Sequence, residues 1–189
     1  NYSTYFSSMI IDGEEMPIAT SYKFSTIGEH SVLFKIAEGV DITNLYRMFY
    51  NCSALKTVDL SELDMSLVTS TSNSAGTAYM FYNCTGLKSI ILPESTKYLG
   101  YYMFYGCYNV EQFIIKAKIA PTLYGYNSFG YSSSYIGYNT RTYGTNKFQI
   151  PIEATGYDTT VWTNYLFNAS YCGFKKSSPY IKQECTNLE

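Results

Sequence analysis

Among the side chains that could do chemistry, three cysteines recur at the same place in a repeated phrase. Cys52, Cys84 and Cys107 each end a copy of the phrase Met-Phe-Tyr-Asn-Cys or Met-Phe-Tyr-Gly-Cys. Thiols at one phase of a repeat point the same way, whereas a disulfide requires Cβ vectors that converge. We therefore expect a column of free thiols that pack as small buried apolar groups.

Metal binding by the remaining candidate ligands is not expected. Cys172 and Cys185 lie outside the repeat and could pair in an oxidising compartment or stay free, and the sequence favours neither outcome. No Cys-x-x-Cys pair occurs, and His30 is the single histidine, so a zinc site is not predicted. The densest acidic cluster consists of Asp59, Glu62 and Asp64. It indicates a solvated edge or, at most, a weak cation site.

Catalysis would require a nucleophile, a base and an orienting group that lie close together. His30 follows Gly28-Glu29 in an expected turn, where an exposed or hydrogen-bonded imidazole is ordinary. The run from Tyr126 to Gly130 is not a nucleophile elbow, and the chain has no glycine-rich phosphate-binding loop. We predict that the protein is not an enzyme and holds no cofactor. A hydrolase with paired carboxylates, or with a cysteine and His30, is the least favoured alternative.

The composition argues against nucleic acid as a partner and against a membrane span. The formal net charge is -2 and no Lys/Arg cluster occurs, whereas nucleic-acid binding depends on neutralising phosphates. No stretch approaches the ~18 consecutive apolar residues of a transmembrane helix. Half of the 22 tyrosines lie between Tyr98 and Tyr143, and low charge combined with many Ser, Thr, Asn and Tyr suggests a surface that forms hydrogen bonds without ionic repulsion.

The residues around each repeated phrase predict a unit that begins as a tight turn and ends as a strand. In the first copy Phe49, Cys52 and Leu55 keep a step of three, and the step then falls to two at Val58 and Leu60. Later copies continue the pattern with Leu87, Ile90 and Leu92, and with Val110, Phe113 and Ile115. We expect coils stacked about 4.8 Å apart, with the phenylalanines at 49, 81 and 104 directly over one another.

The spacing of these phenylalanines locates an insertion in the first unit. Phe49 and Phe81 are 32 residues apart, whereas Phe81 and Phe104 are 23 apart. The nine additional residues fall at about 70–78, a polar stretch without apolar period that indicates a loop. A weaker fourth unit has Phe129 in its turn, a long Tyr-rich loop at 131–146, and Phe148 and Ile150 in its strand.

The chain is expected to form one continuous structural unit with three parts. Residues 1–40 are predicted to form an N-terminal β-hairpin cap, with strands near 9–11, 22–25 and 32–36. Residues 41–152 form the repeat array. Residues 153–189 form a C-terminal cap, with a short helix at 157–168 and a last strand at 171–175. Caps are required because an uncovered coil would expose its apolar core and an open strand edge.

Two surfaces are candidates for binding a partner. Residues that alternate with the buried strand positions must point outward and form a ladder on the open sheet face. The ladder consists of Thr57, Asp59, Ser89, Ile91, Gln112, Ile114, Lys147 and Gln149. The second candidate is the set of loop tyrosines Tyr126, Tyr131, Tyr135, Tyr138 and Tyr143. Tyrosine offers a large contact area at low entropy cost, but rings packed down on the scaffold are the more ordinary outcome.

The run from Met80 to Pro93, followed by Leu99-Gly100 and the next Met-Phe-Tyr-Gly-Cys, resembles the BspA-type leucine-rich repeat of bacterial surface proteins. The closing segments are also similar to the ends of such arrays: Ala120-Pro121-Thr122, Asn127-Ser128-Phe129 and Phe148-Gln149-Ile150-Pro151. The resemblance covers roughly residues 45–170. It implies a mainly β, right-handed leucine-rich-repeat solenoid of about four coils with short helical turns.

The same resemblance implies a function. Proteins of this type are exported, often as lipid-anchored surface proteins, and are associated with adhesion to host matrix proteins or to other bacteria. We therefore expect a cell-surface adhesion module that recognises a host or bacterial surface protein, with the signal segment and any lipid anchor outside this chain. The alternative is a glycan-binding accessory protein of a surface nutrient-uptake system. The sequence does not indicate an oligomeric state.

Overall fold

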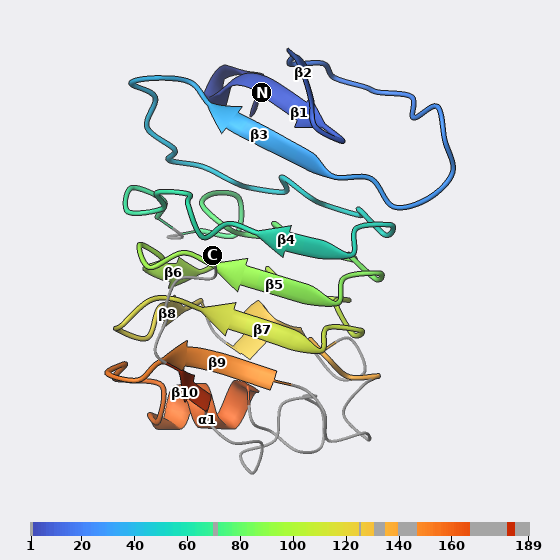
Figure 1. Cartoon of the computed structure of the whole chain (residues 1–189). Coiled ribbons are helices and arrows are strands. Elements are labelled where there is room, and N and C mark those ends of the chain that lie inside the picture. The colour runs from blue at the N-terminus through green and yellow to red at the C-terminus, as the bar shows by residue number, and fades with distance from the viewer. Residues whose placement is uncertain are drawn as a thin grey trace. The chain divides into compact units, whose positions relative to one another are not determined.

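The computed structural model describes residues 2–69, 72–124, 126–130, 135–139, 147–166 and 181–183 (Figure 1). The described chain is mainly strand with few helices, as the sequence predicts. It divides into two compact units, Asn1–Ile42 and Thr43–Glu189. Whether the first unit caps the second stays a prediction.

The first unit is a three-stranded antiparallel sheet that follows the short 3-10 helix η1 (Tyr2–Tyr5). Its strands are β1 (Phe6–Ile11), β2 (Glu14–Pro17) and β3 (Val32–Ile36), in the order β2-β1-β3. The expected strand at 22–25 is wrong, because β2 begins immediately after the Asp12-Gly13 turn. Both turn residues have positive φ, 51° and 90°, which suits a two-residue hairpin.

The second unit contains a five-stranded parallel sheet in the order β10-β9-β7-β5-β4 (Figure 1). The strands are β4 (Thr57–Asp59), β5 (Ser89–Leu92), β7 (Gln112–Ile115), β9 (Lys147–Pro151) and β10 (Ile181–Gln183). A second parallel pair joins β6 (Tyr98–Leu99) to β8 (Thr122–Leu123). The remaining elements are the 3-10 helix η2 (Tyr126–Phe129) and the helix α1 (Thr160–Leu166).

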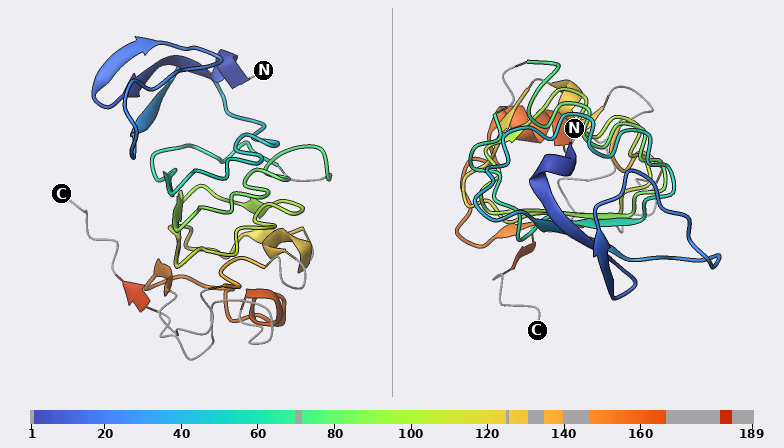
Figure 2. Two further views of the ribbon diagram at one scale, coloured as in Figure 1. Left: turned by 90° about the vertical axis from the view of Figure 1, so that its right-hand side faces the viewer. Right: turned by 90° about the horizontal axis from the view of Figure 1, so that it is seen from above.

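The phenylalanines of successive turns lie directly over one another, which confirms the predicted register. Phe49 and Phe81 have ring centroids 5.3 Å apart at 4°, and Phe81 and Phe104 have centroids 5.7 Å apart at 6°. Phe129 continues the column, 6.2 Å from Phe104 at 9°. Phe81, Phe104 and Phe129 are fully buried. Seen from above, the coils from teal to yellow overlay one another (Figure 2).

Backbone hydrogen bonds join each turn to the next. The N–H of Phe49 donates to Met80 and that of Phe81 donates to Met103, both at 2.9 Å. Gly76 and Ala78 also take part, because Leu45 and Arg47 donate to their carbonyls. The stack therefore already includes the last residues of the stretch that the spacing assigns to the insertion.

Left-handed residues recur at fixed places in these turns. Asn51, Asn83 and Gly106 have φ of 61°, 57° and 79°. Asparagine and glycine tolerate this region better than other residues do. This requirement explains why the repeated phrase reads Asn-Cys twice and Gly-Cys once.

The segment after β9 packs on the end of the array. The hydroxyl of Tyr157 donates to the Ala117 carbonyl at 2.9 Å, and Nε1 of Trp162 donates to Pro121 at 3.2 Å. The predicted helix starts too early, because Tyr157 is a buried anchor three residues before α1 begins. The expected last strand at 171–175 lies outside the described residues.

Candidate functional site

The parallel register arranges the predicted ladder as two rows of four. One row runs Thr57, Ser89, Gln112, Lys147, and the other runs Asp59, Ile91, Ile114, Gln149. None of the eight residues is buried, whereas Val58, Ile90, Phe113 and Phe148 between the rows are. The structure therefore brings together, on the outer face of one sheet, all eight residues that the sequence assigns to it.

Hydrogen bonds along the ladder hold its polar side chains in place. Ser89 Oγ donates to Gln112 Oε1 at 3.0 Å, and Gln112 Nε2 donates to Gln149 Oε1 at 3.3 Å. Ile91 and Ile114 are register partners at the middle of the other row and are half-buried. The exposed Asp59 and Lys147 lie on the first and last strands of the ladder. The face is thus a small apolar centre with a preordered polar surround.

The predicted tyrosine loop is only partly described. Tyr131 and Tyr143 lie outside the described residues, and for Tyr126 the backbone alone is described, in η2. Tyr135 is 6% exposed, so its ring packs inward and is not available as a contact residue. Tyr138 is half-buried. For Tyr135 the structure therefore agrees with the packed-down alternative, and the contact role of the other loop tyrosines stays a prediction.

A different set of tyrosines does form a surface, which we call the tyrosine face. Its inner column stacks in parallel: Tyr50 and Tyr82 are 5.0 Å apart at 9°, and Tyr82 and Tyr105 are 4.8 Å apart at 6°. The outer column consists of Tyr46, Tyr79, Tyr101 and Tyr124. Tyr102 lies between the columns, with ring contacts to both. Seven of these eight residues are half-buried and Tyr124 is 40% exposed.

The outer column differs from the inner one in ring orientation. Its neighbours meet nearly edge to face, at 88°, 67° and 88°, with centroids 6.1, 5.8 and 5.9 Å apart. The Arg47 guanidinium lies 4.8 Å from the Tyr50 ring centroid, 5.1 Å from Tyr46 and 5.4 Å from Tyr79, which is cation–π range. Partial burial raises the pKa of Tyr79 and of Tyr82, and electrostatic interaction with neighbouring tyrosines raises it further. Both hydroxyls therefore remain protonated hydrogen-bond donors at neutral pH.

Sequence reasoning missed the tyrosine face although one signal was present. A tyrosine follows the stacked phenylalanine in all three copies of the repeated phrase, and these tyrosines are the inner column. The outer column has no single place relative to the phrase, because Tyr79 directly precedes Met80 whereas Tyr46 and Tyr101 stand two residues before Met48 and Met103.

The repeat cysteines are free thiols, as predicted. Cys84 and Cys107 are buried, and their Sγ atoms donate to the carbonyls of Phe49 and Phe81 at 3.0 Å. Burial raises the pKa of the Cys107 thiol far above its ordinary value. The prediction of burial is wrong for Cys52, which is exposed and which, within the second unit, belongs to the first repeat and has a stacked repeat on one side. The buried thiols are packing groups.

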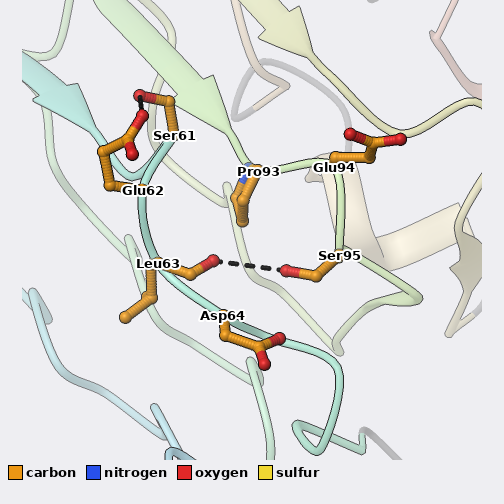
Figure 3. Close-up of a pocket in the computed structure, with 7 residues that line it drawn as sticks. All are labelled: Ser61, Glu62, Leu63, Asp64, Pro93, Glu94 and Ser95. Carbon is orange, nitrogen blue, oxygen red and sulfur yellow. Dashed lines mark hydrogen bonds between the residues drawn. The ribbon is translucent and has the colours of Figure 1, made fainter.

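The acidic cluster is explained by turn formation. Asp59 accepts a hydrogen bond from the Ser61 N–H, and Asp64 accepts one from the Ser66 N–H, both at 2.8 Å. The second bond lowers the pKa of Asp64. Glu62 and Asp64 border a shallow pocket, in whose lining the Ser95 hydroxyl donates to the Leu63 carbonyl at 3.2 Å (Figure 3). Among the described residues, no group of three or more His, Cys, Asp or Glu is placed to hold a metal ion.

His30 forms an ion pair that fixes the irregular segment between β2 and β3. Its Nδ1 lies 2.7 Å from Asp12 Oδ2, its Nε2 lies 3.1 Å from the Thr26 carbonyl, and its ring stacks on Phe24 at 4.2 Å. Asp12 also accepts the Ser31 N–H at 2.8 Å. The hydrogen bond to Asp12, then that to Thr26, raises the pKa of His30 above its ordinary 6.5. The hydrogen bond from His30 lowers the pKa of Asp12 below 3.8.

This pair predicts a pH dependence of the first unit. Because its pKa is raised, His30 stabilises the folded first unit fully below pH 6.5, and this stabilisation is lost as the pH rises through the pKa of the folded state. Asp12 stabilises the folded unit above pH 3.8, and its stabilisation is lost as the pH falls through the lowered pKa. We expect NMR titration to place the His30 pKa above 6.5 and Asp12→Asn to return it toward that value. A wild-type pKa at or below 6.5 would contradict the pairing.

No helix in the part of the chain that the structure describes is long and apolar enough to cross a bilayer.

Comparison with known proteins adds a family. The family model described as a BspA type leucine rich repeat region (6 copies) matches residues 49–150, more than half of the 189 residues. No curated protein and no solved structure matches the chain. The matched region begins at the first stacked phenylalanine and ends in β9.

Proposed function

Because the chain belongs to the BspA-type leucine-rich repeat family, we propose that it is a non-catalytic adhesion module displayed on a bacterial surface. Its partner is a protein on a host cell, in host matrix or on another bacterium. Export is part of this proposal, with a lipid anchor upstream of the chain as one means of attachment. We also propose that the stacked repeats form a right-handed solenoid of about four coils, at 41–152, between caps at 1–40 and 153–189.

The observation that carries the proposal is the in-register ladder on the parallel sheet. Protein interfaces combine an apolar centre with a polar rim, and Ile91 and Ile114 are surrounded by polar ladder residues in this way. Ser89, Gln112 and Gln149 are already hydrogen-bonded to one another, so binding would cost little additional side-chain entropy. The strands that carry them are paired on both sides at β5, β7 and β9, which gives the surface a rigid base.

Charge substitutions at the apolar centre test the ladder. Ile91→Glu and Ile114→Glu each place a carboxylate where a partner would bury an isoleucine, so we expect binding at least about tenfold weaker. The measurement is surface plasmon resonance on immobilised fibronectin, laminin and collagen, and on whole bacterial cells. Ile119→Glu is the matched control, since Ile119 is 75% exposed and lies outside the ladder. Saturable binding that neither ladder variant weakens would assign adhesion to another surface.

Comparison of a loop variant with a ladder variant distinguishes the alternative, a glycan-binding accessory protein, from the adhesion module. A glycan bound by the loop tyrosines would give binding to a glycan array that Tyr138→Ala weakens and Ile114→Glu leaves unchanged. For a hydrolase, the described residues offer little support, because His30 is held by Asp12 and the thiols of Cys84 and Cys107 donate to backbone carbonyls.

A further inference from the structure

We propose that the tyrosine face is a second binding site, distinct from the ladder, and that it takes a neutral, linear polysaccharide. The site is the inner column, the outer column and Tyr102 as defined above. The inference goes beyond the proposed adhesion function, and it places glycan binding on tyrosines other than those of the loop.

The chemistry of the face matches that of a sugar ring. A pyranose has an apolar face of C–H groups and a rim of hydroxyls that donate and accept hydrogen bonds. A partly exposed tyrosine offers an apolar ring beside a hydroxyl that also donates and accepts. Eight such residues gather here from segments that are up to 78 positions apart in the sequence, from Tyr46 to Tyr124.

Charge selects a neutral polymer over an acidic one. Arg47 lies against three of the rings, at 4.8 to 5.4 Å from their centroids. A polyanion would require a row of cations, because each neutralised phosphate or carboxylate contributes to affinity. One guanidinium already engaged with tyrosine rings does not provide that row. Nucleic acid and acidic polysaccharide are therefore poor fits.

Repetition selects a polymer over a single small molecule. The inner column repeats every 4.8 to 5.0 Å and the outer column every 5.8 to 6.1 Å, so the same contact recurs along the stack. A ligand with repeating units can occupy successive contacts at once, and the second contact is then intramolecular. The contact groups on a globular protein do not recur at a fixed interval, whereas the sugar units of a linear polysaccharide recur along its whole length.

Ring orientation assigns a role to each column. Parallel rings in the inner column cover one another's faces, so that column presents ring edges and hydroxyls. In the outer column neighbouring rings meet edge to face, and Tyr124 at the end of the column is 40% exposed. A sugar ring would stack on Tyr124, and further sugar units would form hydrogen bonds with hydroxyls of both columns.

The residue before each copy of the repeated phrase has a left-handed backbone. Tyr79 and Tyr102 have φ of 55° and 51°, and Arg47 at the same place in the first copy has φ of 61°, in the region that costs a residue with a side chain roughly 1–2 kcal/mol. At the other left-handed position of the turn the chain uses Asn83 and Gly106, which tolerate it. Such strained residues concentrate at ligand-binding sites.

Affinity electrophoresis of the full chain tests the proposal. Native gels containing hydroxyethylcellulose, galactomannan or dextran are compared with gels containing polygalacturonate or no polymer. We expect at least one neutral polymer to retard the protein and polygalacturonate not to. The double variant Tyr101→Ala, Tyr124→Ala should bind about tenfold more weakly, since it removes one end of the outer column. Ile91→Glu should bind as the wild type does, so loss of adhesion and loss of glycan binding are distinguishable.

Other outcomes overturn the assignment. No retardation by any of the three neutral polymers, or equal retardation of the double alanine variant, removes the site. A concentration-dependent dimer in analytical ultracentrifugation that the same double variant abolishes would assign the face to a second copy of the chain instead. If the alanine variant does not fold, the double variant Tyr101→Phe, Tyr124→Phe is measured in the same gels instead. Weaker binding supports the hydroxyl contacts, and unchanged binding overturns them and the proposal with them.

Discussion

Phe81→Ala is expected to lower the free energy of unfolding of the second unit by about 3–5 kcal/mol. Phe81 is fully buried and its ring stacks on Phe49 at 5.3 Å and on Phe104 at 5.7 Å. Alanine would remove the middle of this column and leave a cavity between two repeats. The backbone of both repeats is fixed there by the bonds from Phe49 to Met80 and from Phe81 to Met103, so the cavity cannot close by collapse.

Urea denaturation followed by circular dichroism measures this effect. Ile119→Ala is the matched control, because Ile119 is 75% exposed and its truncation should change the free energy of unfolding by less than about 0.5 kcal/mol. Phe104→Ala should resemble Phe81→Ala, since its ring has stacked neighbours on both sides. A loss below about 1 kcal/mol for Phe81→Ala would show that the column is not the core of the array.

The phenylalanine column and the ladder could be predicted because the same short phrase recurs. Identical local sequence gives identical local backbone, and stacked copies then place equivalent residues over one another. No long-range information is needed for this placement, and the predicted rows from Thr57 to Lys147 and from Asp59 to Gln149 are correct. The free thiols of Cys84 and Cys107 follow from the same repetition.

Errors arose where copies stop being equivalent. Cys52 has the same sequence context as Cys84 but belongs to the first repeat, so equal local sequence did not give equal burial. In the first unit Tyr22 to Ser25 has the residue types of a strand, yet the two-residue turn at Asp12-Gly13 pairs β1 with β2 first. Tyr157 fits a helical apolar pattern, but its hydroxyl reaches the Ala117 carbonyl and anchors the chain before the helix.

The tyrosine face could not be read from the sequence for a different reason. Tyr46, Tyr79, Tyr101 and Tyr124 are neighbours in space, but they take no single place relative to the repeated phrase, since Tyr79 directly precedes Met80 whereas Tyr101 stands two residues before Met103. Their proximity depends on how the segments before each repeated phrase stack, which is a tertiary property. A surface that gathers unequal positions is visible only after the stack is known.

Gly100→Ala is expected to be as severe as removal of a core ring, although it adds only one methyl group. A Cβ at Gly100 would lie 2.5 Å from the Ala78 nitrogen, 2.7 Å from the Thr77 carbonyl carbon and 2.9 Å from the Ala78 Cα. All three are backbone atoms of the preceding repeat, so no side-chain rotation can relieve the overlap. The two repeats must separate locally, which would also break the bond from the Gly100 N–H to Thr77 Oγ1.

We expect Gly100→Ala to lower the free energy of unfolding by about 3 kcal/mol or more, above the usual range for overpacking, because backbone must move. Gly39→Ala is the comparison. Gly39 has φ of 71° with nothing within 4 Å of an added Cβ, so alanine there adds backbone strain of about 1 kcal/mol without overlap. Chemical denaturation of both variants separates close approach from strain. Equal, small losses would mean that neighbouring repeats are not held at the observed distance, and the stacking that aligns both the ladder and the tyrosine face would then be looser than the contacts at Gly100 require.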